Sequence, residues 1–166
     1  MAFEPQISKM LLREASSGDI AILAMHHRKM FEEIWEQKGE PLGITRADEI
    51  ENAYTKKLDL ELGSGICKAW VIEDEGKIVS SGAITFVSFV PNPSDLSSRV
   101  GYLHSMYTEK SGRNKKCAQR IILKAISHCK AQGIMRIILN ASDAGQPVYQ
   151  KMGFRSAPDI LRLYLE

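Results

Sequence analysis

The chain has 166 residues, of which 44% are hydrophobic and 25% are charged, a balance typical of a single globular domain. Its 22 basic and 20 acidic residues leave a net charge of +2, which argues against nucleic acid as the main partner. The three cysteines lack metal-ligand spacing, no apolar run is long enough to span a membrane, and no signal-peptide pattern begins the chain. We therefore expect a cytoplasmic protein without a metal site.

The first part of the chain is expected to hold one strand and two helices. Residues 10–12 form a short apolar run, which predicts a strand that starts near Ile7. Apolar residues recur at helical spacing over residues 20–34 and predict a helix that ends before Gly39. A second helix is expected to begin at Thr45 and to end at the next Gly-Ser-Gly run.

The middle of the chain has β character. Residues 68–73 and 77–90 are apolar runs joined by a short Asp-Glu-Gly turn, which predicts a hairpin. Pro91 and Pro93 cannot donate to a β-ladder, so a loop is expected there. Another strand is expected over residues 100–108.

The last part alternates helices and strands. We expect a helix over residues 118–132, ended by Gly133, and an apolar strand over residues 134–139. A short helix and a final strand complete the pattern. This order of elements predicts an α/β sheet with helices on its faces.

The connection before the helix at 118–132 is strongly basic. Five cations fall within eleven residues, namely Lys110, Arg113, Lys115, Lys116 and Arg120. Cations at a helix N-terminus oppose the helix dipole and cost up to about 1 kcal/mol each, unless an anion binds there. A solvated helix start would have the same composition. The concentration of charge nevertheless indicates a small phosphate-bearing ligand.

Residues 102–154 resemble the acyl-CoA-binding core of the GCN5-related N-acetyltransferase (GNAT) superfamily. The run Arg113-Asn-Lys-Lys116-Cys-Ala118 resembles the family's phosphate loop, Arg/Gln-x-x-Gly-x-Gly/Ala. Residues 140–154 resemble its closing motif, in which a tyrosine (Tyr149) precedes a Gly-Phe pair. Residues 12–20 are similar to the usual entry into its first helix.

The resemblance implies a single N-acetyltransferase domain over residues 1–166, with an acyl-CoA-binding core at about residues 100–154. The implied fold is α/β: a mixed, mostly antiparallel twisted sheet with helices on both faces and a splayed central parallel strand pair. The implied activity is transfer of an acetyl or similar acyl group from CoA to a primary amine, by direct attack in a ternary complex. The acceptor is then a small-molecule or peptide amine, with neither nucleic acid nor membrane involved, and a homodimer is left open.

Two other functions compete with this one. A non-catalytic acyl-CoA-binding or regulatory domain would have the same fold, and it is favoured by Lys116 and by the lack of an obvious base. A nucleic-acid-binding module would use the basic loop, but few aromatic residues are interleaved with it.

The resemblance also implies which residues hold acetyl-CoA or another acyl-CoA. The expected set is Met106, Tyr107, Thr108, Arg113, Asn114, Lys115, Lys116, Cys117, Ala118, Asn140 and Tyr149. An amide near Tyr107 would stabilise the oxyanion. Lys116 departs from the family's glycine, and its side chain would either add a cation to the phosphates or crowd them. Asn140 would either bind the cofactor arm or cap its strand.

The resemblance implies that Tyr149 protonates the leaving thiolate; a half-buried aromatic residue is the alternative. The candidates for the base are His104 and Glu33, with Glu32 and Glu109 as rivals. Phe31, Glu32 and Glu33 on the first helix are expected to contact the acceptor amine. The adjacent pair His26-His27 would face different directions on a helix, which is poor geometry for a metal.

Overall fold

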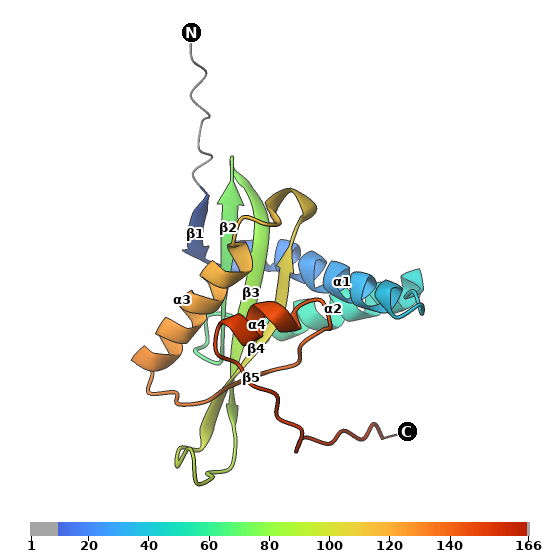
Figure 1. Ribbon diagram of the computed structural model, residues 1–166. Coiled ribbons are helices and arrows are strands. Elements are labelled where there is room, and N and C mark those ends of the chain that lie inside the picture. The colour runs from blue at the N-terminus through green and yellow to red at the C-terminus, as the bar shows by residue number, and fades with distance from the viewer. Residues whose placement is uncertain (1–9, 166) are drawn as a thin grey trace.

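The structure is a computed structural model that describes residues 10–165, so the expected start of the first strand near Ile7 lies outside it. One five-stranded sheet has the order β1-β2-β3-β4-β5 (Figure 1). Neighbours are antiparallel from β1 to β4, whereas β4 and β5 are parallel. The strands are β1 (Leu11–Glu14), β2 (Cys67–Asp74), β3 (Lys77–Ser88), β4 (Arg99–Thr108) and β5 (Ile137–Leu139). The expected mixed, mostly antiparallel α/β fold is confirmed.

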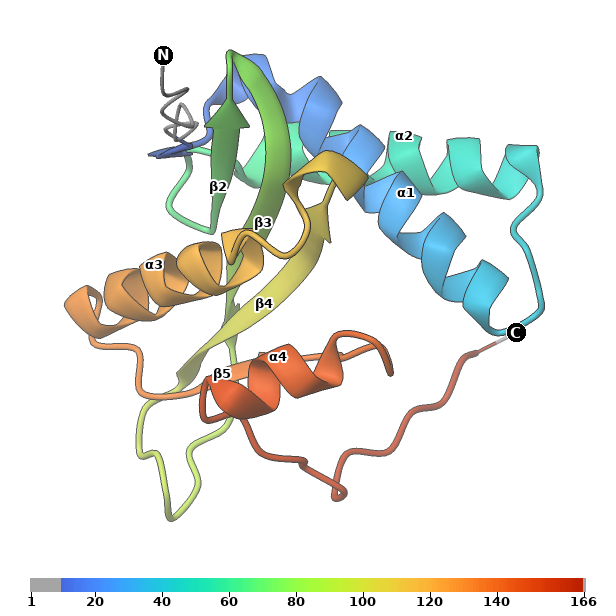
Figure 2. The same ribbon diagram turned by 45° about the horizontal axis from the view of Figure 1, so that its top comes forward.

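Helices cover both faces of this sheet (Figure 2). One face carries α1 (Ile20–Gln37) and α2 (Ile44–Glu61), and the other carries α3 (Cys117–Ala131) and α4 (Gln146–Lys151). Two short 3-10 turns, η1 (Ser17–Asp19) and η2 (Lys110–Gly112), stand before α1 and α3. The expected start of α2 at Thr45 is one residue late, because Gly43 adopts the extended N-cap conformation.

Each face buries its own apolar core. Trp70 packs with Ile121 on the α3 face, and Val71 packs with Leu58 on the face of α1 and α2. Strand β2 is covered on both sides, which explains why residues 69–72 are all buried and do not alternate with polar residues. Burying one such large side chain contributes about 1.5–3 kcal/mol.

The hairpin of β2 and β3 forms as predicted. Asp74 pairs with Lys77, so Glu75 and Gly76 make a two-residue loop. Both have positive φ, 50° and 77°, which matches the right-handed twist of the flanking strands. The turn therefore sets the register of the two pairs next to it, and a bulge between Ile72 and Glu73 shifts the pairing by one residue beyond them.

Strand β4 is irregular in its second half, on both of its edges. Its pairing with β5 ends at Leu103, opposite Leu139, and β4 continues to Thr108 without that partner. On the other side the register with β3 shifts, because Ser81 pairs with Tyr107 but Ala83 pairs with His104. The early end of β5 leaves the edge of β4 open over residues 104–108. This is the expected splayed strand pair.

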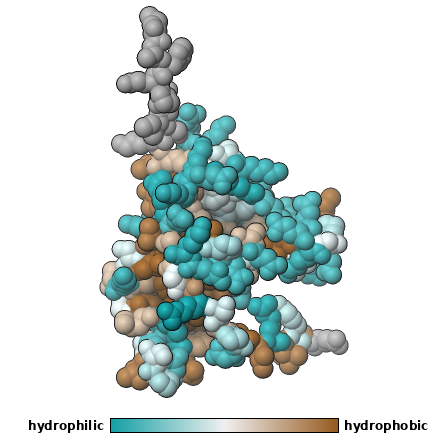
Figure 3. All heavy atoms as spheres, in the orientation of Figure 1, coloured by the Kyte–Doolittle hydropathy of each residue, from teal (hydrophilic) through white to brown (hydrophobic). Residues whose placement is uncertain are grey.

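The C-terminal segment differs from the expectation. No strand follows α4 within residues 10–165, so β5 forms an edge and the parallel pair is not central. Large apolar side chains of this segment are mostly exposed, as are those of the β3–β4 connection (Figure 3). They are Ile160, Leu161, Leu163, Tyr164 and Leu165, together with Phe89, Val90 and Leu96. Of the helices in the described part, none is long and apolar enough to cross a membrane.

Candidate active site

The loop between β4 and α3 has the backbone of an anion cradle. Asn114 and Lys116 both adopt left-handed conformations, with φ of 62° and 60°, and Lys116 is the N-cap of α3. The first N–H groups of an α-helix have no intrahelical acceptor and carry the positive end of the dipole. Position 116 thus keeps the conformation that glycine favours, although the residue there is an exposed lysine. The fold of this loop fits a pyrophosphate.

Cys117 is a packing residue of this loop. Its thiol is buried and lies 3.4 Å from the carbonyl oxygen of Gly112. Burial raises the pKa of the thiol, in spite of its place at a helix N-terminus. Ala118 follows it inside α3, partly buried.

The open edge of β4 carries the next group of expected cofactor residues. Ser80 donates to the carbonyl oxygen of Tyr107 (3.0 Å), which fixes that part of β4 on β3. The carbonyl oxygen of Thr108 accepts a 3.0 Å hydrogen bond from Nε of Arg113. The Met106 side chain lies over Gly82, which has the space for it only because it has no Cβ. The carbonyl oxygens of Tyr107 and Thr108 are thus both hydrogen-bonded, the first by Ser80 and the second by Arg113 of the loop.

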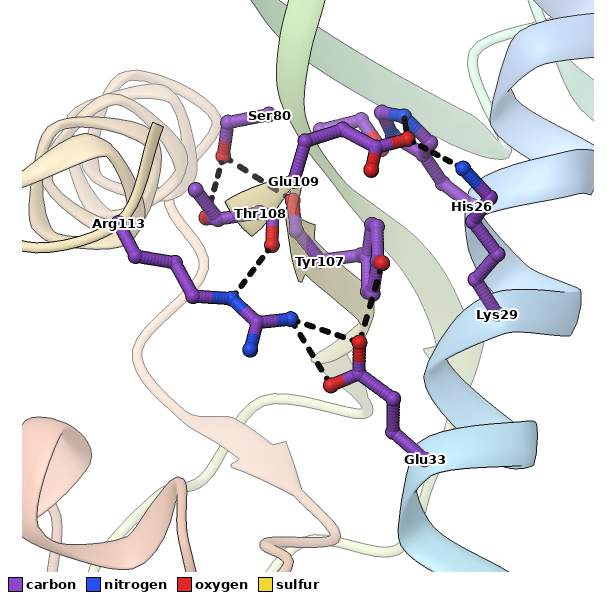
Figure 4. Close-up of polar contacts among 9 residues, drawn as sticks. His26, Lys29, Glu33, Ser80, Tyr107, Thr108, Glu109 and Arg113 are labelled. Carbon is purple, nitrogen blue, oxygen red and sulfur yellow. Dashed lines mark hydrogen bonds and ion pairs between the residues drawn. The ribbon is translucent and has the colours of Figure 1, made fainter. Parts of the chain in front are cut away.

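The structure brings Arg113 of the loop onto Glu33 of α1, 80 residues away (Figure 4). Nη2 of Arg113 lies 2.7 and 2.9 Å from the two carboxylate oxygens. Tyr107 donates from its hydroxyl to the same carboxylate at 3.1 Å. Burial and the charge of Glu33 raise the pKa of Tyr107 to about 12, so this phenol stays protonated. Glu33 is thus engaged by two donors.

A second polar cluster lies beside this ion pair (Figure 4). Lys29 donates to Glu109 at 2.6 Å, and Nε2 of the fully buried His26 lies 3.4 Å from the same carboxylate. Burial lowers the pKa of His26. The surface here is hollowed into an open groove of about 570 Å³, lined among others by Lys29, Glu32, Glu33, Glu36 and Tyr107.

His104 has partners at both ring nitrogens. Nε2 lies 2.7 Å from Oγ1 of Thr85, and Nδ1 lies 2.9 Å from Oγ of Ser105. Burial, followed by the charges of Lys57 and His27, lowers the pKa of His104 to about 3. His104 is therefore neutral at pH 7.

His27 is the residue of this region whose role was not recognised in the sequence. Its Nδ1 lies 2.8 Å from Oγ of Ser105, and its ring stacks on Tyr54 with centroids 3.9 Å apart. Burial lowers its pKa to about 4. The available signal was its position on the apolar stripe of α1, four residues after Leu23 and four before Phe31.

The remaining expected acceptor residues lie on the same helix. Phe31 meets His27 edge to face with centroids 5.0 Å apart, and Glu32 accepts a 3.0 Å hydrogen bond from Arg28. His26 and His27 face different strands, as expected for adjacent helix residues. No group of three or more metal-binding side chains occurs within residues 10–165.

Tyr149 and Asn140 lie on the α3 side of the sheet and beyond β5. The ring of Tyr149 packs against the core cluster and meets Phe154 with centroids 5.8 Å apart. Burial raises the pKa of Tyr149 to about 12, so the phenol is protonated at neutral pH. Asn140 donates to the hydroxyl of Tyr102 at 2.7 Å and accepts from Arg162 at 3.1 Å.

Known proteins are similar to this chain in sequence and in fold. The family model of the acetyltransferase (GNAT) family matches residues 27–154. A glucosamine 6-phosphate N-acetyltransferase of Arabidopsis thaliana is 27% identical over 99 residues, which span 58% of this chain and 64% of that protein. The match thus covers less than two thirds of the relative's length.

Solved structures extend the likeness over most of the chain. A predicted acetyltransferase from Clostridium acetobutylicum, solved with acetyl-CoA, has a TM-score of 0.81 and 28% identity, covering 93% of this chain and 96% of its own. A GCN5-related N-acetyltransferase from Ralstonia eutropha JMP134 has the same fold, with a TM-score of 0.83 and 22% identity over 93% of this chain and 98% of its own. With its open β4 edge and its left-handed loop before α3, the chain belongs to the GNAT acetyltransferase family.

Proposed function

We propose that the protein transfers an acetyl or related acyl group from acyl-CoA to a primary amine, by direct attack in a ternary complex. The observation that carries the proposal is the continuity of two features: the unpaired edge of β4 leads directly into the left-handed loop at the N-terminus of α3. A bound acyl-CoA would supply the thioester. Its pyrophosphate would lie on the loop and its pantetheine arm along the strand edge.

In this proposal each expected cofactor residue has a physical task. The backbone of residues 113–118 would bind the pyrophosphate, and the backbone of residues 106–108 would bind the arm and the thioester oxygen. Asn140, at the end of β5, would contact the arm. Tyr149 would protonate the departing sulfur, since its phenol holds its proton at neutral pH.

The amine would approach from the side of α1. Phe31 offers an apolar contact there, and Glu32 and Glu36 place negative charge on the exposed side of the helix. Such a surface attracts a cationic acceptor. We place the reaction in the cytoplasm, because all three cysteines are free and buried.

Calorimetry with acetyl-CoA and a thiol-release assay test this function together. The amine panel contains glucosamine 6-phosphate, an aminoglycoside, spermidine and a lysine peptide. We expect acetyl-CoA binding and thiol release with at least one amine. Binding without release from any amine would support a non-catalytic acyl-CoA-binding domain instead, and absence of binding at millimolar concentration would rule out both.

A variant pair links the binding to the loop. Arg113→Gln removes a cation next to the cradle, whereas Arg46→Gln removes an exposed cation of α2 whose ion pair within residues 10–165 is with Glu49. We expect weaker acetyl-CoA binding and a smaller salt dependence for Arg113→Gln alone. Equal loss in both variants would point to non-specific attraction.

A further inference from the structure

A hydrogen-bonded chain joins α1 to β4 at the point where β4 parts from β5. Oγ of Ser105 lies 2.8 Å from Nδ1 of His27 and 2.9 Å from Nδ1 of His104. His104 uses its other nitrogen, Nε2, on Thr85 at 2.7 Å. Nε2 of His27 has no hydrogen-bond partner among residues 10–165, and His27 is only partly buried. This nitrogen is the free end of the hydrogen-bonded chain.

The local backbone is distorted in a way that builds this chain. Ser105 is buried and adopts φ of 55°, a left-handed conformation that costs a non-glycine residue about 1–2 kcal/mol. In a regular strand, neighbouring side chains point to opposite faces. The bulge opposite Gly82 instead sets His104 and Ser105 side by side, within hydrogen-bond distance. Strain of this kind persists where the surrounding contacts demand it.

The hydrogen-bonding capacity of Ser105 decides where the protons lie. Its hydroxyl has one hydrogen, so one histidine receives it and the other must donate to the oxygen. If Ser105 donates to His104, then Nε2 of His104 donates to Thr85 and Nδ1 of His27 donates to Ser105. Nε2 of His27 then keeps a free lone pair. The opposite order leaves an N–H at that nitrogen without a protein acceptor, and orphaned donors are rarer than orphaned acceptors.

Other candidates for a base in this region are engaged. Glu33 accepts from Arg113 and Tyr107. Glu109 pairs with Lys29, and both nitrogens of His104 have partners. Among residues 10–165, His26 also has a ring nitrogen without a hydrogen bond, but that Nε2 is fully buried and lies 3.4 Å from Glu109. His27 is only partly buried, so its Nε2 is the nitrogen that a ligand can approach.

We propose that Nε2 of His27 accepts the proton of the attacking amine, and that Ser105 and His104 are positioning residues that fix its tautomer. This inference rests on the proposed acyl transfer. The amine lone pair forms the C–N bond to the thioester carbonyl carbon, and the carbonyl π pair moves to oxygen. The N–H bond then breaks, with its proton going to Nε2 of His27. As the C=O bond re-forms, the C–S bond breaks and the sulfur takes a proton from Tyr149. The proton on His27 returns to Tyr149 through solvent, which balances the reaction.

The charge state of His27 suits this task. Burial lowers its pKa to about 4, so it is neutral at pH 7 and able to accept a proton. The titratable groups around this series of hydrogen bonds are Tyr54 and Lys57 of α2 and His104 of β4. The amine nitrogen that has bonded to carbon carries positive charge, which makes its N–H more acidic than that of the free ammonium ion and lets a weaker base take the proton.

Nitrogen NMR of ¹⁵N-histidine-labelled protein at pH 7 tests the tautomer directly. We expect the His27 proton on Nδ1 in the native chain, and a shift towards Nε2 in Ser105→Gly. Glycine adopts the φ of position 105 without strain, so this variant should fold. Glu75→Gly is the matched control, since Glu75 has φ of 50° in the β2–β3 turn and is exposed. A native His27 protonated on Nε2 overturns the inference, whatever the protein's activity.

Kinetics test the consequence, with the panel amine that releases thiol fastest. His27→Asn keeps a polar atom near Ser105 but removes the acceptor at Nε2. We expect its kcat to fall about 100-fold or more while the acetyl-CoA Kd is unchanged. Added imidazole should partly restore His27→Ala. A native kcat in Ser105→Gly or in His27→Asn overturns the inference, whereas failure of the native chain to bind acetyl-CoA contradicts the proposed function instead.

Discussion

Arg113 and Glu33 form an ion pair that joins the phosphate loop to α1. One nitrogen of Arg113, Nη2, lies 2.7 and 2.9 Å from the two carboxylate oxygens. Nε of the same guanidinium holds the carbonyl oxygen of Thr108 on the open edge of β4. One side chain thus spans the loop, the strand edge and the first helix. An anionic ligand on the loop would compete with Glu33 for this cation.

We therefore expect Glu33→Gln to tighten acetyl-CoA binding. The gain should reach up to about five-fold, which corresponds to the ~1 kcal/mol upper range of partly exposed ion pairs. Calorimetry at low and high salt measures it. Glu36→Gln is the control. It removes the same charge one helical turn further along α1, from a residue that forms no ion pair with Arg113 within residues 10–165. Equal Kd values for the two variants would contradict the competition.

Tyr149→Phe should lower kcat about 100-fold and leave the acetyl-CoA Kd unchanged. The reason is that the phenol, whose pKa burial raises to about 12, is the proton donor assigned to the leaving sulfur. Thiol release and calorimetry give the two numbers. Tyr164→Phe removes an exposed phenol as a control. Native turnover in Tyr149→Phe would remove this residue from the donor's role.

Lys116→Gly should stabilise the protein by about 1 kcal/mol. Lysine at φ of 60° is strained, and glycine adopts this conformation freely. For a chain of this length the gain raises Tm by roughly 2–4 °C in a thermal melt. Lys115→Gly serves for comparison, since Lys115 is not among the residues with positive φ. A Tm gain shared by both variants would show that removal of loop charge, and not backbone strain, is responsible.

Gly82→Ala should destabilise the fold by about 1–3 kcal/mol, because a Cβ at this position overlaps the sulfur of Met106 and lies 2.9 Å from Cγ2 of Ile121. Urea denaturation measures the loss. Gly43→Ala has open space around its Cβ and should cost less than about 1 kcal/mol, through the weaker N-cap of α2 alone. Equal urea midpoints for the two variants would mean that the Met106 side chain moves away without a loss of stability.

The stability of the protein should fall in acid through Asp19. Its hydrogen bond with Arg13 lowers the pKa of the carboxyl to about 2, from an ordinary value near 3.8. The folded state thus favours the carboxylate, and the contribution is present above pH 4 and disappears between about pH 4 and 2. The shift corresponds to about 2 kcal/mol. Asp19→Asn should lose this amount of unfolding free energy at pH 7. Its urea midpoint should also change less with pH below pH 4 than the midpoint of the native protein.

Local patterns in the sequence predicted the elements whose signals are local. The helix expected over residues 118–132 forms at Cys117–Ala131, and the two-residue turn closes the predicted hairpin. The strand expected over residues 134–139 is shorter, because Ile134 closes the preceding helix through its N–H bond to Cys129 and buries its side chain there. An apolar run alone cannot distinguish a helix cap from a strand.

The candidate site was only partly accessible to sequence reasoning. The phosphate loop is one continuous segment, so its composition and the family motif were visible together. The partners of Glu33 and His27 come from β4 and the loop, about 80 residues later in the chain. The bulge at Ser105 arises from pairing with Gly82, and nothing in residues 100–108 alone indicates it.

Adjacent histidines on α1 each bond a serine from a different strand: His26 to Ser81 of β3, and His27 to Ser105 of β4, both at 2.8 Å. These bonds fix the rotation of the helix about its axis as well as its position. One residue inserted between His27 and Glu33 would turn the remainder of α1 by about 100° and carry Glu33 away from Arg113. Over evolution this helix can exchange side chains, but it cannot change its length between these two residues.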